Sequence, residues 1–406
     1  MRSAEIVVTG LGLVTPAGIG VDATWDRVCA GTPTAAPDAA LAGGPVDFSC
    51  RVPDSPAAPL LPPRRARRMD RFVQFAVVAA HEAVADAGLD PSRWDGARVG
   101  IVLGCADGGP ATVEQQHRVL LAEGPGQVSS LLLPMQLPNM VAGQLAIELG
   151  ATGPNLVVAT ACASGATAIG LARDLLLLDR CDIVLTGGTE AMITPLVMAG
   201  FAQMGALSRR REDPAAAARP FDVARDGFVA GEGAGVLVLE RRPDAVARRV
   251  RVRARIAGAG SSADAHHVTA PDPQGRGAEA AIRAALVQAG VTGAEVDHVN
   301  AHGTGTPLND LVESQVVHRV IGRHTLVTST KAVTGHLFGA AGAVETALAV
   351  LTVEQGMVPP TANLDDPDPR IEVEVAQKPT PRRVDLAVST SLGFGGQNAA
   401  VLVGRA

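Results

Sequence analysis

A cysteine and two histidines stand in glycine- and threonine-rich surroundings and could do chemistry together. Cys162 lies in T-A-C-A-S-G, between an apolar, β-branched run that predicts a buried strand and a pattern typical of a helix. A thiol at a strand-to-helix bend faces the positive end of the helix, which favours the nucleophilic thiolate. A cysteine there can equally be an inert core residue. The functional interpretation therefore depends on partner groups elsewhere in the chain.

The two histidines are the candidate partners. His302 lies in N-A-H-G-T-G-T-P and His336 in S-T-K-A-V-T-G-H, each shortly after a predicted strand. A single histidine is more often structural, but two in such settings, together with a cysteine at a helix start, favour a catalytic site. A third loop, S-L-G-F-G-G-Q-N, carries Phe394 between glycines that suggest mobility. The other seven histidines lack this context.

Strands and helices that alternate along the chain must position these groups. Apolar runs predict strands, and apolar residues at helical spacing predict helices between them. The predicted strands cover 5–14, 97–104, 156–158, 182–188, 236–240, 251–260, 296–300, 326–329, 386–389 and 399–403. The predicted helices cover 72–87, 140–149 and 277–290, and small-residue helices follow Cys162 and residue 329. Residues 33–63, rich in Pro, Ala and Gly, suggest a surface excursion. This alternation is typical of α/β layers.

The second part of the chain repeats the pattern of the first. Gly233–Glu240 (G-A-G-V-L-V-L-E) is similar in place and pattern to Gly396–Val403 (G-Q-N-A-A-V-L-V). We therefore predict an internal duplication, with one half at 1–250 carrying the cysteine and another at 251–406 carrying both histidines. The site would lie between them.

The composition excludes several functional classes. The chain is 47% hydrophobic and 19% charged, so it should bury a large core, and a net charge of -6 provides no general field for nucleic acid. Its apolar stretches are interrupted, so we expect no membrane span. The five cysteines form no C-x-x-C pair, and residues 1–5 do not resemble a secretory signal. We expect a cytoplasmic protein without a metal site.

Five motifs occur in a recognisable order. They are T-A-C-A-S-G, R-P-F-D-x-x-R-D-G-F-V-x-G-E-G-A-G, N-A-H-G-T-G-T-P, S-T-K-x-x-T-G-H-L-x-G-A-A-G-A-V-E and G-F-G-G-x-N. The sequence thereby resembles the β-ketoacyl-ACP synthases from residue 5 to residue 403. It is most similar to the elongating synthase II type and to the ketosynthases of type II polyketide systems. The resemblance implies the thiolase fold, an αβαβα five-layer sandwich of two duplicated halves.

The resemblance also implies a decarboxylative condensation. Cys162 would accept an acyl chain from acyl carrier protein as a thioester. His302 and His336 would hold the malonyl thioester carbonyl, because loss of CO₂ leaves an enolate whose oxygen needs hydrogen-bond donors. The enolate carbon would then attack the Cys162 thioester, and backbone N–H groups would stabilise the tetrahedral oxyanion.

Further roles follow from the same motifs. The resemblance assigns Lys331 and Glu345 as a support pair around the second histidine, and Phe394 and Gly395 as the oxyanion and gate loop. It assigns Thr304 and Thr306 to pantetheine contacts, and Asp107 and Phe201 to the acyl pocket. It implies no bound cofactor, because phosphopantetheine on the carrier brings the substrates. It implies a dimer, either with a second copy or with a chain-length-factor-like homologue.

Two further features bear on substrates and partners. Residues 64–71 (R-R-A-R-R-M-D-R) are either a solvated helix start or a docking patch for the acidic carrier protein. Asp107 stands where fatty-acid elongators usually carry an apolar residue. A carboxylate beside an alkyl chain is costly, so either Asp107 is solvated or paired, or the substrate is not a plain fatty acyl chain. Asp107 therefore favours polyketide or polyene synthesis over primary fatty-acid elongation.

Two other functional classes share part of this pattern. A non-catalytic chain-length subunit of the same fold would lack the nucleophile, whereas Cys162 and both histidines are present. A thiolase would use a second cysteine near its C-terminus, but the last cysteine here is Cys181.

Overall fold

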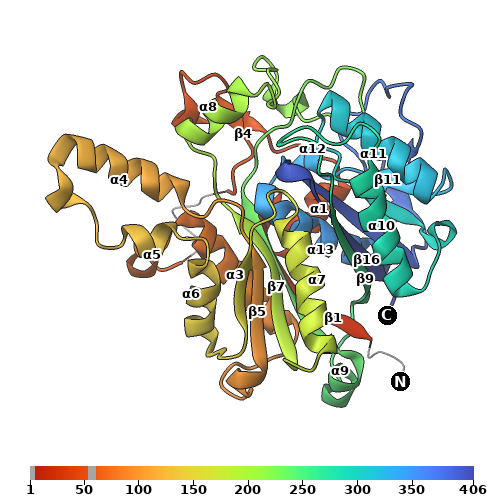
Figure 1. The fold of residues 1–406 in the computed structure, drawn as a ribbon, viewed down its shortest axis with the longest axis horizontal. Helices are drawn as coiled ribbons and strands as arrows, with labels where there is room; N and C mark the ends of the chain where they lie inside the picture. The colour runs from red at the N-terminus through yellow and green to blue at the C-terminus, as the bar shows by residue number, and fades with distance from the viewer. Residues whose placement is uncertain (1–4, 54–60) are drawn as a thin grey trace.

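A long mixed sheet runs through the computed structural model, which describes residues 5–53 and 61–406 (Figure 1). Its first half uses strands β1 (Ile6–Thr15), β5 (Val99–Gly104), β6 (Asn155–Val158), β7 (Ile183–Glu190) and β8 (Gly233–Arg241). They lie in the order β6-β5-β7-β8-β1. β5 pairs in parallel with β6 and β7, whereas β8 runs antiparallel to β7 and β1.

The second half of the sheet repeats this arrangement. Its strands are β9 (Ala254–Ala263), β10 (His298–Asn300), β11 (Leu326–Thr328), β15 (Leu386–Gly393) and β16 (Gln397–Gly404). They lie in the order β11-β10-β15-β16-β9, with the same parallel and antiparallel pairings as their counterparts. The halves join where β1 pairs antiparallel with β9, at Val7 with Arg255 and Val8 with Ala254. The predicted boundary at residue 250 falls between helix α9 (Arg242–Arg248) and β9.

Helices form three layers around the two half-sheets. α7 (Ser164–Leu177) and α13 (Ala341–Gln355) lie between the half-sheets and contact each other and both halves. α3 (Arg71–Asp86) and α6 (Met140–Leu149) cover the outer face of the first half-sheet. α10 (Arg276–Ala289) and α11 (Pro307–Val320) cover the outer face of the second. The five layers confirm the predicted αβαβα sandwich.

The small residues of α7 and α13 allow the two central helices to pack closely. A Cβ on Gly165 would lie 2.7 Å from the backbone N of Ala343, and a Cβ on Gly342 would lie 2.9 Å from that of Ala166. Every residue of α13 from Ala341 to Val353 is buried. A helix covered on all sides has no solvent-facing polar side, which explains why most of this stretch is small or apolar; the charged exception, Glu345, pairs with Lys331.

Two expectations about burial were wrong. The strand before Cys162 was predicted to be buried, but β6 pairs with only one neighbour and leaves Leu156 47% exposed. Residues 33–63 were predicted to be a surface excursion, yet Val46, Phe48 and Cys50 are buried, and Cys50 donates its N–H to Ala230. The alternating apolar residues from Val46 to Val52 outweigh the loop-like composition around them. Residues 54–60 of that stretch lie outside the described residues.

An arm projects from the body beyond α6 (Figure 1). It consists of α4 (Pro110–Glu123), α5 (Leu132–Gln136) and the segment between them. Only Thr112 of α4 is buried, while Leu121 and Leu133 are exposed. The arm therefore presents apolar side chains that this chain leaves uncovered. Among the described helices, none is both long and apolar enough to cross a membrane.

Candidate active site

A sharp bend places Cys162 at the start of α7. Ala161 adopts φ +49°, a left-handed conformation that costs a residue with a Cβ about 1–2 kcal/mol. The Ser164 hydroxyl stabilises the bend, because Oγ accepts the Thr160 N–H at 2.9 Å and donates to the Ala161 carbonyl at 2.6 Å. The bend turns the thiol toward the second half of the molecule.

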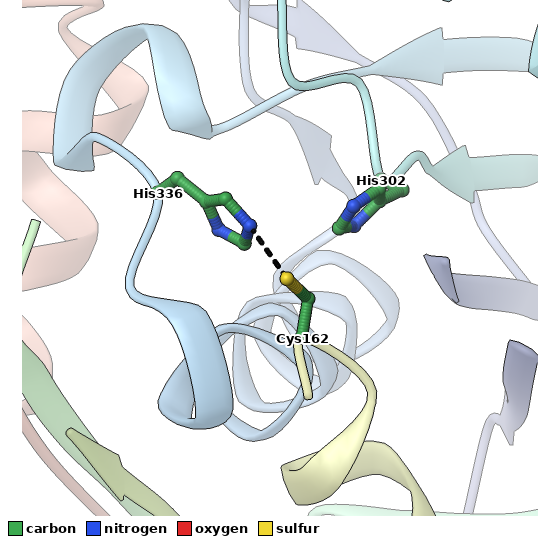
Figure 2. Close-up of side chains that lie close together, drawn as sticks. All are labelled: Cys162, His302 and His336. Carbon is green, nitrogen blue, oxygen red and sulfur yellow. Dashed lines mark hydrogen bonds between the residues drawn. The ribbon is translucent and has the colours of Figure 1, made fainter. Parts of the chain in front are cut away.

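Cys162, His302 and His336 meet in one cluster (Figure 2). Cys162 Sγ lies 3.1 Å from His336 Nε2, and one donor atom from each of the three residues lies within 4.8 Å of the others. The imidazole ring centres are 5.3 Å apart and the rings nearly perpendicular, at 84°. The cysteine of one half and the histidines of the other thus form a single site, as the sequence predicted.

His336 lies where the predicted helix is interrupted, and this interruption positions its side chain. The helix predicted after residue 329 is divided into α12 (Lys331–Thr334), a 3-10 turn η6 (Phe338–Ala340) and α13. Gly335, at φ +69°, ends α12. His336 then donates its N–H to Val229 at 2.7 Å and accepts the Gly231 N–H at 2.8 Å. These bonds place the His336 ring over the cysteine instead of in the core.

Hydrogen bonding determines which nitrogen of His336 carries the proton. The Phe338 N–H donates to His336 Nδ1 at 3.3 Å, so this nitrogen is an acceptor. Burial, together with the positive charge of Lys331, holds the His336 pKa well below its usual value. A neutral ring that accepts at Nδ1 keeps its proton on Nε2. His336 therefore presents an N–H donor at the site, and not the lone pair that a general base or a metal ligand needs.

The thiol is neutral in this environment. Burial raises the Cys162 pKa to about 11, although Lys331 and the Phe394 N–H lower it in part. The sequence predicted that the helix start would favour the thiolate; burial acts in the opposite direction, because it disfavours the charged form of the thiol.

A buried carboxylate positions His302. The backbone N–H groups of His302 and Gly303 each donate to Glu313 of α11 at 2.8 Å, and Thr390 Oγ1 donates to the same carboxylate at 2.7 Å. Sequence reasoning missed Glu313. The available signal was an acidic residue beside Val312 and Val316, on the apolar face of a predictable helix. Burial, Lys331 and His336 together hold the His302 pKa well below its usual value.

Lys331 and Glu345 form a buried ion pair beside the histidines. Lys331 Nζ donates to Glu345 Oε1, and both side chains are buried. Burial raises the Glu345 pKa to about 7 even though Lys331 lowers it. Removing one partner of such a pair leaves an uncompensated charge, so the two side chains act as a unit. The pair lies where the sequence predicted support for the second histidine.

A cavity of about 240 Å³ contains the cluster and the predicted loop residues. Thr304 and Thr306 line it, with their hydroxyls 2.9 Å apart. Phe394 also lines it, and its N–H points to the Cys162 sulfur. The N–H of Gly395, the other residue predicted for this loop, points away from the sulfur and donates to the Val268 carbonyl at 2.8 Å. Of the two predicted residues, Phe394 therefore directs its N–H at the sulfur, whereas Gly395 supplies the turn at φ +80°.

A second cavity, of about 410 Å³, adjoins the first. Both are lined by Ala106, Ala161, Met192 and Phe201, so a chain attached to Cys162 would pass these residues. The Phe201 ring stacks on Phe338 at 5.3 Å. Of the two cavities, Asp107 lines only the second, and its side chain is exposed in the single chain. The protein atoms around its carboxyl group still remove part of its hydration, which raises the Asp107 pKa. The two predicted acyl-pocket residues therefore lie along one path.

The predicted basic patch is smaller than its sequence suggests. Arg71 donates to the buried Glu232 carboxylate at 2.8 Å, which makes it part of the fold. Arg65 forms an ion pair with Glu148 of α6. Arg64, Arg67 and Arg68 are exposed at and after the short helix α2 (Pro63–Ala66). We call these three residues the arginine patch.

Comparisons with known proteins agree over nearly the whole length of the chain. Residues 3–245 match the beta-ketoacyl synthase N-terminal domain, and residues 253–365 match its C-terminal domain. A 3-oxoacyl-[acyl-carrier-protein] synthase 2 from Synechocystis sp. is 41% identical, covering 98% of this chain and 97% of the relative. Among solved structures, the ishigamide ketosynthase/chain length factor matches with a TM-score of 0.92 at 33% identity, covering 100% of both chains.

A further solved structure is a type II PKS acyl-carrier protein in complex with its ketosynthase, bound to the hexaketide. It matches with a TM-score of 0.90 at 30% identity, again over 100% of both chains. Likeness at this level extends over both halves of the sandwich. The chain therefore belongs to the beta-ketoacyl synthase family.

Proposed function

We propose that the protein is a β-ketoacyl-[acyl-carrier-protein] synthase, an acyltransferase that condenses a malonyl thioester with an acyl chain held on Cys162. The observation that carries the proposal is the contact between the thiol and the N–H donor of His336, with His302 on the other side of the same cavity. A nucleophile and two imidazoles at one point match the needs of acyl transfer followed by enolate formation.

In the first half-reaction, the Cys162 sulfur attacks the thioester carbonyl of the acyl carrier. The N–H groups of Cys162 and Phe394 receive the oxyanion. The bond to the pantetheine sulfur then breaks, and the thiol proton ends on that departing sulfur. Because the thiol is neutral at rest, the donors around the sulfur must stabilise the thiolate as it forms.

In the second half-reaction, the bond between the malonyl methylene and its carboxylate breaks, and CO₂ leaves. The electron pair moves to the thioester oxygen as an enolate, which the His336 Nε2–H and His302 stabilise. The enolate carbon attacks the acyl-Cys162 carbonyl. The carbon–sulfur bond then breaks, and the released thiolate takes up a proton. The product is a β-ketoacyl carrier two carbons longer than the acyl chain.

Direct assay tests this proposal. The wild-type protein, incubated with a saturated acyl carrier and malonyl carrier, should release CO₂ and form the β-ketoacyl carrier, both measurable by mass spectrometry and trapped label. Formation of CO₂ without condensation across a broad series of acyl carriers would contradict the proposal and favour a decarboxylase role.

We also propose the partners and setting. The related complexes, the arginine patch and the exposed arm support an acyl carrier protein and a dimer with either a second copy or a chain-length-factor-like homologue. Phosphopantetheine on the carrier would bring the substrates, so the enzyme itself would need no cofactor. All five cysteines are free thiols, and Cys162 must remain reduced to react, which supports a cytoplasmic location.

Charge reversal in the arginine patch should weaken the carrier's interaction with the enzyme. The double variant Arg67→Glu, Arg68→Glu should raise the KM for acyl carrier roughly ten-fold at low salt, because acidic carriers are steered by exposed positive charge. The difference should shrink as salt is added. Arg93→Glu, Arg323→Glu, at two other exposed positions, is the matched control. Equal kinetics for both double variants at every salt concentration would place docking elsewhere.

Asp107 should limit the chains that the pocket accepts. It lines the second cavity, and a carboxylate beside an alkyl tail is unfavourable. Asp107→Ile should therefore raise the acylation rate with long saturated chains about ten-fold while leaving short chains unchanged. Rates from acyl carriers of graded length, read by intact mass, check this. Equal profiles in the two proteins would remove the main support for a polyketide or polyene substrate.

A further inference from the structure

Glu190, the last residue of β7, is a buried carboxylate directly behind the pocket wall. Its side chain is fully buried. Oε2 accepts the Ala106 N–H at 2.7 Å, and Oε1 accepts the Asp107 N–H at 3.4 Å and faces the Cys105 thiol at 3.6 Å. Cys105, Ala106 and Asp107 form the turn after β5, in which Ala106 lines both cavities and Asp107 lines the second. One carboxylate therefore holds three successive residues of this turn.

The Glu190 carboxylate is buried without a positively charged partner among the described residues, which disfavours its ionised form. Burial raises the Glu190 pKa to about 7, and the nearby charge of Asp107 adds to the effect, while the two N–H donors lower it. Its hydrogen-bond donors among the described residues are backbone N–H groups and one thiol, and none is a cation. Burying a carboxylate without a counter-ion costs several kcal/mol, so an apolar residue would give a more stable fold unless the carboxylate has a specific use.

The carboxylate also packs against the turn that follows His336. A Cβ on Gly339 of η6 would lie 2.4 Å from Glu190 Oε2 and 2.7 Å from the Ala106 backbone N. Gly339 thus lets this turn lie directly on the bond between Glu190 and Ala106. Its neighbour Phe338 lines the catalytic cavity and stacks on the His336 ring at 5.1 Å. Glu190 therefore lies between the pocket wall and the support of a catalytic histidine.

We propose that Glu190 is a positioning residue that fixes the wall at Ala106 and so determines how easily long acyl chains enter the second cavity. The inference rests on the proposed ketosynthase function. An ionised carboxylate offers acceptors to all three donors of the turn. In Glu190→Gln one acceptor becomes an NH₂ group that must face an N–H or a thiol, so the turn cannot keep all its bonds. The wall then moves into the path shared by the two cavities.

The test compares acylation of Cys162 by a four-carbon and a twelve-carbon acyl carrier in single turnover, read by intact mass, with malonyl decarboxylation measured separately. Glu190→Gln should lower the twelve-to-four-carbon rate ratio at least five-fold and change decarboxylation less than two-fold. Glu240→Gln is the matched control, because Glu240 is a buried carboxylate on the adjacent strand that pairs with Arg248. It should lower the unfolding midpoint without changing the ratio.

A pH series separates positioning from stability. Protonation removes an acceptor from Glu190 much as glutamine does, so the wild-type ratio should fall between pH 8 and pH 6, while the Gln variant stays level. Among the residues that the structure describes, the other titratable groups that interact with Glu190 are Cys105, Asp107 and Cys162; burial keeps both thiols protonated throughout this range. A ratio that is equal in both proteins and flat with pH would overturn the inference. Failure of the wild type to accept any acyl chain would instead overturn the proposed function.

Discussion

Replacement of Cys162 by alanine should abolish transfer of the acyl chain to the enzyme while preserving part of the malonyl decarboxylation. The thiol is the atom that forms the thioester, whereas the His336 Nε2–H and His302 stabilise the enolate oxygen and remain in place. Acylation should fall at least about 10³-fold, the scale of losing a covalent nucleophile. Intact mass after incubation with acyl carrier measures the first effect, and release of CO₂ from malonyl carrier measures the second.

The control for this variant is Cys181→Ala. Cys181 is fully buried in the core cluster and does not line the cavity, so both activities should persist. An acyl adduct on the Cys162→Ala protein would remove Cys162 from the proposed role. Loss of both activities without unfolding would show that the thiol also takes part in decarboxylation.

Replacement of His336 by alanine should have the opposite profile. Loss of one preorganised donor to a developing oxyanion costs about 10²–10³ in rate, so decarboxylation should fall by that factor. Acylation should fall less, because the thiol and the N–H of Phe394 remain. His302→Ala should behave similarly in decarboxylation.

The matched control is a histidine with a structural role. His298 is fully buried on β10, and its Nδ1 bonds to the Leu326 carbonyl at 2.8 Å. His298→Ala should lower stability and leave the ratio of decarboxylation to acylation unchanged. If all three histidine variants lower both activities by one common factor, the imidazoles act through the fold and not on the enolate.

Local pattern was enough to predict much of the architecture. The strand and helix alternation, the repeat between the halves and the meeting of Cys162 with His302 and His336 all follow from apolar spacing and short glycine-rich motifs. These features are encoded by residues close together in the sequence, so they can be predicted from one sequence alone. β6 was placed in the core because its composition is apolar, but composition does not say whether a strand has neighbours on both sides.

The residues that hold the site in place were harder to predict. Glu313 and Glu190 bond to backbone groups that lie 10 and 84 residues away, and such pairings leave no periodic signal. The break at Gly335 falls within a sequence that otherwise favours helix, and tertiary bonds to Val229 and Gly231 decide it. The neutral thiol and the proton on Nε2 depend on burial and on a single backbone donor. Neither is visible before the chain is folded.

The central layer has a consequence for how the chain acquires its activity. α7 belongs to one half and α13 to the other, yet each is covered only when both half-sheets are present. Neither half alone can therefore bury the apolar surface of its inner helix, and folding should be cooperative across the whole length of the chain. β1 pairs with β8 more than 200 residues away, which makes the process slow. During synthesis, the cysteine leaves the ribosome long before the histidines, so a partly made chain carries an ordinary thiol and cannot condense substrates prematurely.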